Sequence, residues 1–290
     1  MPELPEVETV VRGLRRLIVG KNIVKVSHDN AKSFPNSEVE VDNFMIGASI
    51  KNVRRRAKVI MIDLDNDWSL VIHLKMTGQM VYRGEENWGA GHPNDDFLAE
   101  LPAKATRVQI EFGDNSKLFF NDQRKFGWMR LLPTAEIKNI PFFMKVGPEP
   151  LEDSFTPEDF ISRFARKKRS VIKAALLDQS VVAGIGNIYA DEALWRARIH
   201  PETRVEALSG LDFENLYEAV RYVMNLSIEK GGSTARNYVN ADGGKGNYLD
   251  YANVFRKEGT LCARCGAEII KTRVAGRGTH ICPVCQKAKV

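Results

Sequence analysis

The chain has 290 residues, 43% of them hydrophobic, and carries 42 basic against 37 acidic side chains, a net charge of +5. That composition is typical of a water-soluble protein with a sizeable core and two or three domains. No apolar run approaches the roughly 18 residues that a membrane span needs, and charge from Glu3 onward excludes a secretory signal, so a cytoplasmic location is expected.

The first predicted element is a helix from about residue 3 to residue 18, ended by Gly20. Its apolar stripe consists of Val7, Val10, Val11, Leu14 and Ile18. Short runs of β-branched and aromatic residues then predict strands, at 23–26, 59–62, 70–74, 108–112 and 118–120. Such short strands favour a β-sandwich or barrel, with the stretch 84–106, rich in Gly, Pro, Asn and Asp, as a long loop.

Helical patterns dominate after the sequence Gly-Pro-Glu-Pro at 147–150, which marks a linker. Thr156 and Pro157 predict the start of a helix, because threonine is a good N-cap and proline suits the first turn. Further helices are predicted at 171–177, 188–195 and 211–228, and Gly231 ends the last of them. The residues from about 258 onward form a separate small module.

All four cysteines lie in that module, as two Cys-x-x-Cys pairs with 16 residues between them. They are Cys262, Cys265, Cys282 and Cys285. Thiolates at this spacing can close a tetrahedron around one Zn²⁺, which would stabilise a segment too small to fold unaided. Four thiolates leave no open coordination position, so the metal is expected to be structural. Two disulfides or four unrelated thiols are the alternatives, and an intracellular location argues against the disulfides.

Basic residues gather at 54–58, at 166–169 and over 271–290, where five lysines and arginines occur without an acidic residue. Three separated basic clusters predict a polyanionic partner, first of all a nucleic acid, although a solvated charged surface gives a similar composition. Arg277 lies between two glycines in a predicted hairpin tip, where it either grips a phosphate or faces solvent.

Taken together, these features resemble the bacterial formamidopyrimidine-DNA glycosylases of the formamidopyrimidine-DNA glycosylase/endonuclease VIII family, over the whole chain. The matching motifs are MPELPEVET at the start, RRAK at 55–58, HLKMTG at 73–78, GIGNIYADE at 184–192, GGST at 231–234 and the zinc hairpin. The resemblance implies a bifunctional glycosylase and abasic-site lyase of base excision repair, which removes 8-oxoguanine and formamidopyrimidines from double-stranded DNA.

For the fold, the resemblance implies a multidomain α+β protein. A β-sandwich with a catalytic N-terminal helix is expected at 1–135, a linker at 136–150, a helical helix–two-turn–helix domain at 151–257 and a zinc-finger β-hairpin at 258–290. DNA would lie in the cleft between the two larger domains. The enzyme is expected to be a monomer, associated with the bacterial nucleoid through DNA.

The chemistry depends on whether Met1 is removed. A free Pro2 would be a secondary amine with a pKa near 8, partly unprotonated and nucleophilic at neutral pH, whereas Pro2 behind Met1 is an inert amide. By resemblance, Pro2 attacks C1′ of a flipped nucleotide, Glu3 is the general acid/base, and Lys58 and Arg277 assist two successive eliminations. Without the resemblance, Glu3 is a helix-start charge and Lys58 a solvated lysine.

The resemblance also implies contacts with DNA. Met76 and Phe126 would fill the gap in the base stack, and Arg124 would read the unpaired cytosine; the alternative places Met76 and Phe126 in the core. Contacts with the DNA strands are implied for Lys168, Lys173, Asn187 and Tyr189. Lesion recognition is implied for Glu6, Ser233, Thr234, Arg236 and Tyr238, although helix-start charge explains Glu6 nearly as well.

The chain departs from the family pattern in two places. Ala105 stands where many members carry a histidine, so one DNA contact is missing unless Arg107 replaces it, and the loop at 84–103 is longer than expected. Two other functions stay open. One is an endonuclease VIII acting on oxidised pyrimidines, against which Leu4 and the Arg124/Phe126 pair argue. The other is a zinc-containing DNA-binding protein without catalysis, which a retained Met1 would produce.

Overall fold

The structure is a computed structural model that describes every residue except 30, 93–99, 234–246 and 289–290. The chain divides into two compact units, one formed by Met1–Met144 with Lys230–Asn247 and the other by Lys145–Glu229 with Tyr248–Val290. Among the described residues, no helix is long and apolar enough to cross a membrane. The bounds of the four segments expected from the sequence stay a prediction.

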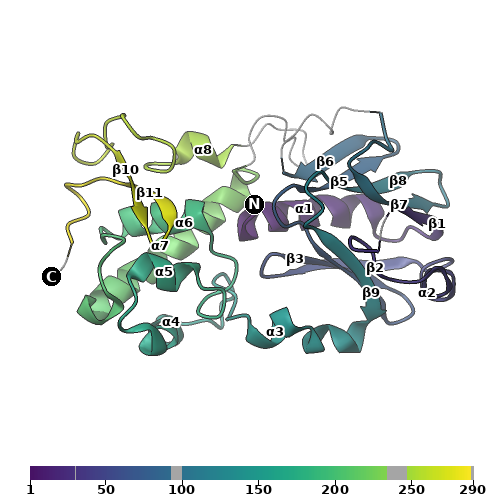
Figure 1. Cartoon of the computed structure of the whole chain (residues 1–290), viewed down its shortest axis with the longest axis horizontal. Helices are drawn as coiled ribbons and strands as arrows, with labels where there is room; N and C mark the ends of the chain where they lie inside the picture. Colours follow the sequence, from purple (N-terminus) through teal and green to yellow (C-terminus); the bar gives the residue numbers. More distant parts are fainter. Residues whose placement is uncertain (30, 93–99, 234–246, 289–290) are drawn as a thin grey trace. The chain divides into compact units, whose positions relative to one another are not determined.

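The first unit contains two antiparallel sheets (Figure 1). One has the order β1-β7-β8-β5-β6, with β1 at Ile23–His28, β7 at Thr106–Phe112, β8 at Lys117–Asp122, β5 at Gly78–Arg83 and β6 at Asn87–Gly91. The other has the order β2-β3-β4-β9, with β2 at Ile50–Arg56, β3 at Val59–Leu64, β4 at Trp68–His73 and β9 at Trp128–Pro133. The β-sandwich prediction is confirmed.

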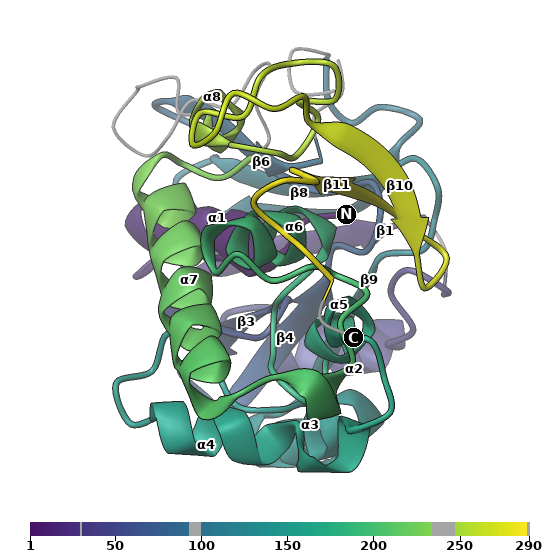
Figure 2. The same ribbon diagram turned by 90° about the vertical axis from the view of Figure 1, so that its left-hand side faces the viewer.

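Helix α1 (Leu4–Ile18) lies between the two sheets (Figures 1 and 2). Its stripe, including Val10 and Leu14, is fully buried in one core with Ile62 of β3 and Phe120 of β8. Burial of apolar surface contributes about 25 cal/mol per Å², so this core anchors the N-terminus of the chain. The remaining elements of the unit are α2 (Glu38–Phe44), the 3₁₀ helix η2 (Thr134–Asn139) and the start of α3 (Pro141–Lys145).

The prediction of a loop over 84–106 is wrong in part, because β6 forms a hairpin with β5 inside that stretch. Trp88 of β6 packs across α1 at Gly13, where an added Cβ would lie 2.1 Å from the indole ring. Periodicity alone could not reveal this strand, because its sequence NWGAG has low β-propensity. Its place in the sheet depends on a tertiary contact with a glycine 75 positions earlier.

The second unit is helical and ends in a small hairpin. Its elements are α4 (Pro157–Arg163), η3 (Ala165–Lys167), α5 (Ile172–Leu177), α6 (Asn187–Arg196), η4 (Val205–Ala207), α7 (Gly210–Glu229), α8 (Tyr248–Tyr251), β10 (Ile270–Val274) and β11 (Arg277–Ile281). Thr156 caps α4 as predicted, since its hydroxyl accepts the Asp159 N–H at 3.2 Å. The predicted hairpin tip is also confirmed: Ala275 and Gly276 form its turn with φ of 48° and 76°.

Candidate active site and metal centre

The first helix begins at a buried pair of residues, Pro2 and Glu3. Glu3 is the N-cap of α1, with extended backbone angles (φ −98°, ψ −174°), and it is 4% exposed. Met1 is 50% exposed. Loss of Met1 therefore removes little from the core, and it leaves the Pro2 nitrogen next to a buried carboxyl group in the sequence.

Glu6 connects the start of α1 to a distant part of the chain. One of its carboxylate oxygens accepts the Glu3 N–H at 2.8 Å, and the other accepts both the N–H and the hydroxyl of Ser233 at 2.8 Å. Gly232 approaches with φ of 88°, and a Cβ there would lie 3.3 Å from Glu6 Cγ. The structure thus brings together two of the predicted lesion-recognition residues. The others, Thr234, Arg236 and Tyr238, lie outside the described residues.

Lys58 lies in the tight turn between β2 and β3, directly after Ala57 in the left-handed conformation (φ 52°). Arg55 stabilises this turn by donating to the Ala57 carbonyl at 3.0 Å, and it pairs with Glu8 of α1 at 3.0 Å. Lys58 is only 5% exposed, so its interpretation as a solvated lysine is wrong. The Lys58 side chain is therefore held in a defined position by a turn that Arg55 and Glu8 support.

His73 is the buried residue at the end of β4. Burial, together with the positive charges of Lys75 and Lys58, lowers its pKa to about 3. The imidazole is therefore neutral at physiological pH, and its Nδ1 accepts the Lys75 N–H at 3.0 Å. The neutral ring fixes the loop that carries Met76.

We expect the stability of the protein to fall between pH 6.5 and pH 5 because of His73. The unfolded histidine has a pKa near 6.5 and binds a proton in this range, whereas the folded one, with a pKa of about 3, does not. Stability linked to His73 is complete above pH 6.5 and decreases by about 2 kcal/mol by pH 5. His73→Asn keeps an acceptor near Nδ1 but cannot titrate, so urea unfolding should show a flatter pH dependence. Equal slopes for both chains contradict the prediction.

Met76 and Phe126 lie in two loops at the same end of the β5–β8 pair, because Met76 precedes Gly78 of β5, Phe126 follows Asp122 of β8, and Gly78 pairs with Asp122. They are 39% and 48% exposed, so their interpretation as core residues is wrong. The Arg124 guanidinium lies over the Phe126 ring at 5.0 Å. An exposed apolar side chain such as Phe126, with an arginine stacked on it, is suited to insertion between bases.

Arg107 does not replace the histidine missing at Ala105. The side chain is 4% exposed, and its guanidinium pairs with Asp29 and donates to the carbonyls of Lys104 at 2.6 Å and Asp122 at 2.9 Å. Its Nε and both of its terminal nitrogens therefore donate to groups inside the unit. The substitution hypothesis for Arg107 is therefore wrong.

The predicted direct phosphate contact of Lys173 is contradicted by its burial. The side chain is 0% exposed, and its ammonium donates to Asp191 at 2.6 Å, to Thr279 Oγ1 at 2.7 Å and to the Gly278 carbonyl at 3.1 Å. The other Asp191 oxygen accepts the His280 N–H at 2.9 Å. Lys173 therefore fastens α5 and α6 to β11, beside Arg277. Sequence reasoning recorded the charge of Lys173 but missed Asp191, whose burial no sequence pattern reveals.

Tyr189 is likewise buried instead of facing a ligand. It is 0% exposed, its hydroxyl lies 2.5 Å from Ser227 Oγ, and its ring packs on Tyr248. Asn187 is partly exposed at the first position of α6 and donates to the Gly278 carbonyl at 3.0 Å. Lys168 and Arg277 are exposed. Of the predicted DNA contacts in this unit, Lys168, Asn187 and Arg277 are accessible, and Lys173 and Tyr189 are not.

The four cysteine sulfurs form one cluster, all within 4.8 Å of one another. Cys262 and Cys285 lie 3.9 Å apart, and Cys265 and Cys282 lie 3.4 Å apart. A disulfide requires about 2.05 Å, whereas four thiolates around Zn²⁺ at about 2.3 Å stand about 3.8 Å apart. The donor set and its spacing therefore fit one structural zinc ion, and the disulfide alternative is wrong.

Helix α6 supports the zinc module with a second buried acid next to Asp191. The Glu192 carboxylate accepts the N–H groups of Asn253, Val254 and Phe255 at 2.8–2.9 Å. Burial raises its pKa, and these backbone donors oppose that rise. Trp195 of the same helix shares a small apolar core with Val254, Ile269 and two of the cysteines.

We expect Cys282→Ser to lower the zinc content from roughly one ion per chain to a small fraction of that, as measured by metal analysis. Binding of a structural zinc ion supplies much of the folding free energy of such modules. Amide hydrogen exchange over 258–288 should therefore become fast, while α1 and the two sheets keep their protection. Protected amides in the hairpin of the zinc-free variant contradict this role of the metal.

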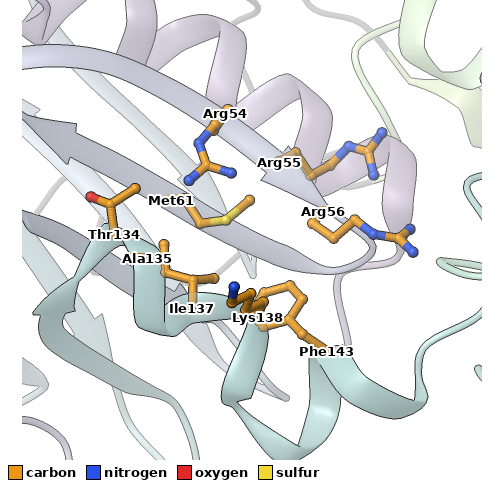
Figure 3. Close-up of a pocket in the computed structure, with 9 residues that line it drawn as sticks. All are labelled: Arg54, Arg55, Arg56, Met61, Thr134, Ala135, Ile137, Lys138 and Phe143. Atoms are coloured by element: carbon orange, nitrogen blue, oxygen red, sulfur yellow. The ribbon is translucent and has the colours of Figure 1, made fainter. Parts of the chain in front are cut away.

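A cavity of about 500 Å³ lies between strands β2 and β3 and the segment η2–α3 (Figure 3). Arg54 and Arg56 lie at one side of it and Ile137 and Phe143 at the other. The positive charge of the cavity is reduced, because the Arg54 guanidinium pairs with Asp63 through Nε and Nη2, at 2.6 and 3.1 Å. The residues that line it include neither Pro2, Glu3 nor Lys58, so this cavity is not the predicted reaction centre.

Three family models match the chain in order. The formamidopyrimidine-DNA glycosylase N-terminal domain matches residues 1–129, and the formamidopyrimidine-DNA glycosylase H2TH domain matches residues 146–239. The zinc finger found in FPG and IleRS matches residues 259–288. The three matches together cover most of the chain.

Curated relatives and solved structures agree with these matches. Formamidopyrimidine-DNA glycosylase of Enterococcus faecalis is 40% identical over 291 residues, covering 100% of this chain and 98% of the relative. Lactococcus lactis Fpg in complex with DNA containing an abasic site superposes with a TM-score of 0.85 and 35% identity, covering 98% and 99% of the two chains. A MutM complex with DNA containing carbocyclic 8-oxo-G gives a TM-score of 0.83 and 35% identity, covering 99% and 100%.

Proposed function

The chain belongs to the formamidopyrimidine-DNA glycosylase family, and we propose that it removes 8-oxoguanine and formamidopyrimidines from double-stranded DNA and then cleaves the strand. It is a DNA glycosylase with one structural zinc ion. The observation that carries the proposal is the buried start of α1, where Pro2, Glu3 and Glu6 lie together and Ser233 is bonded to Glu6. We assign the chemistry to the proposed catalytic domain, residues 1–135.

The proposed reaction begins after removal of Met1. The target nucleotide leaves the base stack, at a cost of a few kcal/mol, and the Pro2 nitrogen forms a bond to C1′. The damaged base leaves with the electrons of its C1′–N bond and takes up a proton. Glu3 donates a proton to the sugar ring oxygen, which opens the ring and gives a Schiff base on Pro2.

Two eliminations follow in the proposal. The iminium acidifies the C2′ proton, Lys58 accepts or relays that proton, and the 3′ phosphate leaves with the electrons of its C–O bond. A second proton loss expels the 5′ phosphate, with Arg277 assigned to that phosphate. Water then hydrolyses the Schiff base and frees Pro2. The buried Lys58 is supported in this role by the rigid turn that Arg55 stabilises.

The proposed DNA interface draws on both units. Met76 and Phe126 occupy the gap in the stack, Arg124 faces the unpaired cytosine, and Glu6 and the segment beginning at Ser233 contact the flipped base. Lys168, Asn187 and Arg277 contact phosphates, and Lys173 positions the finger from inside. One DNA molecule per monomer suffices for this arrangement. Binding to DNA would place the enzyme at the bacterial nucleoid.

Borohydride trapping tests this proposal. The protein, shown by mass spectrometry to start at Pro2, is incubated with a duplex containing one 8-oxoguanine opposite cytosine, and a covalent adduct is expected. A duplex with an oxidised pyrimidine serves as the second substrate and should react much more slowly. Preference for the pyrimidine would identify an endonuclease VIII activity. DNA binding without any adduct would identify a non-catalytic binding protein.

A further inference from the structure

Two loops of the first unit present apolar tips in the same way. In each, a residue with positive φ precedes the tip: Lys75 (φ 50°) precedes Met76, and Lys125 (φ 56°) precedes Phe126. Left-handed backbone in a non-glycine residue costs energy and persists only where neighbouring contacts enforce it. Both loops are therefore held in strained, defined shapes.

The contact that the two loops share is the carboxylate of Asp122, at the end of β8 and 0% exposed. One of its oxygens accepts the Thr77 hydroxyl and the Arg124 N–H, the latter at 3.3 Å. The other accepts the Gly127 N–H at 2.6 Å. One buried charge thus receives donors from the Met76 loop and from both sides of Phe126, and such charge-assisted bonds are strong.

Thr77 connects the two loops directly as well. Its hydroxyl oxygen accepts the Arg124 N–H at 3.1 Å while its proton goes to Asp122. The hydroxyl therefore uses its donor and an acceptor position at once, in a site where Thr77 is 7% exposed. Met76 directly precedes Thr77 in the chain, and Arg124 is joined to Thr77 through its own backbone N–H.

The base of the bridge is rigid. The Asp122 N–H donates to the Ala105 carbonyl at 2.8 Å, and the Asp122 carbonyl accepts Arg107 Nε at 2.9 Å. Gly127 has no room for a side chain, since a Cβ would lie 2.8 Å from Phe120 and 3.1 Å from an Asp122 carboxylate oxygen. Arg107, which does not serve as a DNA contact, thus contributes to the support of both loops.

We infer that Thr77 and Asp122 are positioning residues that hold Met76, Arg124 and Phe126 as one preformed unit for entry into the duplex. The inference rests on the proposed function. Separate flexible loops would each lose conformational entropy on insertion, whereas a preformed unit has already lost it during folding. The bridge also fixes Arg124 relative to the tips, so it should govern discrimination of the base opposite the lesion.

The test compares Thr77→Val with Thr77→Ser. Valine keeps the volume of threonine and removes the hydroxyl, whereas serine keeps the hydroxyl. For Thr77→Val we expect single-turnover excision of 8-oxoguanine opposite cytosine to slow by about 10- to 100-fold, with a reduced preference for cytosine over adenine. Cleavage at a preformed abasic site should change by less than about threefold, because little base displacement is then required. Thr77→Ser should behave as the wild type in both assays.

A fluorescence measurement separates loop insertion from chemistry. A 2-aminopurine placed beside the cytosine opposite the lesion should brighten on binding, more slowly and less fully with Thr77→Val. Excision by Thr77→Val at the wild-type rate overturns the inference, as does an equal loss on 8-oxoguanine and on the abasic site. If the wild type cleaves neither substrate, the proposed function fails instead, so the two failures are distinguishable.

Discussion

A chain with one serine added before Pro2 should form no borohydride adduct and should lose at least about 10³-fold in single-turnover cleavage. The added residue converts the proline nitrogen into an amide, whose lone pair is delocalised into the carbonyl. Loss of a catalytic nucleophile in a serine protease costs on the order of 10⁶ in kcat, so the stated loss is a lower bound. Both an 8-oxoguanine duplex and an abasic duplex should be affected, because both need the amine.

The controls for this experiment distinguish loss of chemistry from loss of fold. The extended chain should bind lesion DNA within about threefold of the protein starting at Pro2, since Met1 is 50% exposed and an extra residue there meets solvent. Proteolytic removal of the serine should restore the adduct. Arg54→Ala, on a strand away from the reaction centre, should keep it. Full cleavage by the extended chain would exclude Pro2 as the nucleophile.

Lys173→Met should lower the free energy of unfolding of the second unit by about 3–5 kcal/mol, the typical cost of leaving one member of a buried ion pair without its partner. Asp191 would remain fully buried and charged, with only its bonds to His280. The double variant Lys173→Met/Asp191→Asn removes that charge and should recover a large part of the loss. Urea unfolding followed by hydrogen exchange in α5 and α6 measures both.

Lys168→Met is the matched control, because Lys168 is exposed and lies five positions earlier. Its loss should leave stability nearly unchanged and should reduce the slope of log K against log salt for DNA binding by about one. If Lys173→Met instead changes only the salt slope and not the stability, Lys173 contacts a DNA phosphate after all.

The sequence predicts those features whose physical cause is local. Helical spacing of apolar residues predicts α1, and two Cys-x-x-Cys pairs predict the zinc cluster, because both depend on short stretches of chain. The sequence does not predict β2, whose end is a run of three arginines. Two of these arginines pair with acids on neighbouring elements, Arg54 with Asp63 of β3 and Arg55 with Glu8 of α1, and such pairing has no signature in a single sequence.

The same distinction explains the errors in the site. Lys173 and Arg107 both carry positive charge, and a sequence gives the charge without the burial. In each case the side chain is buried and pairs with an acid elsewhere in the sequence: Lys173 with Asp191, and Arg107 with Asp29. Exposure, not residue type, therefore separates the basic residues that can meet a phosphate from those that assemble the surface presenting them.

The two adjacent acids of α6 have a consequence for the modularity of the finger. Asp191 holds the hairpin strand and Glu192 holds the chain entering the module, while Trp195 completes its small core. The zinc-binding module at 258–290 therefore depends on contacts with α6 and does not stand alone. Grafting it onto another protein, or exchanging it for a relative's finger, requires a receiving helix that carries acids at two consecutive positions and an aromatic residue one turn later.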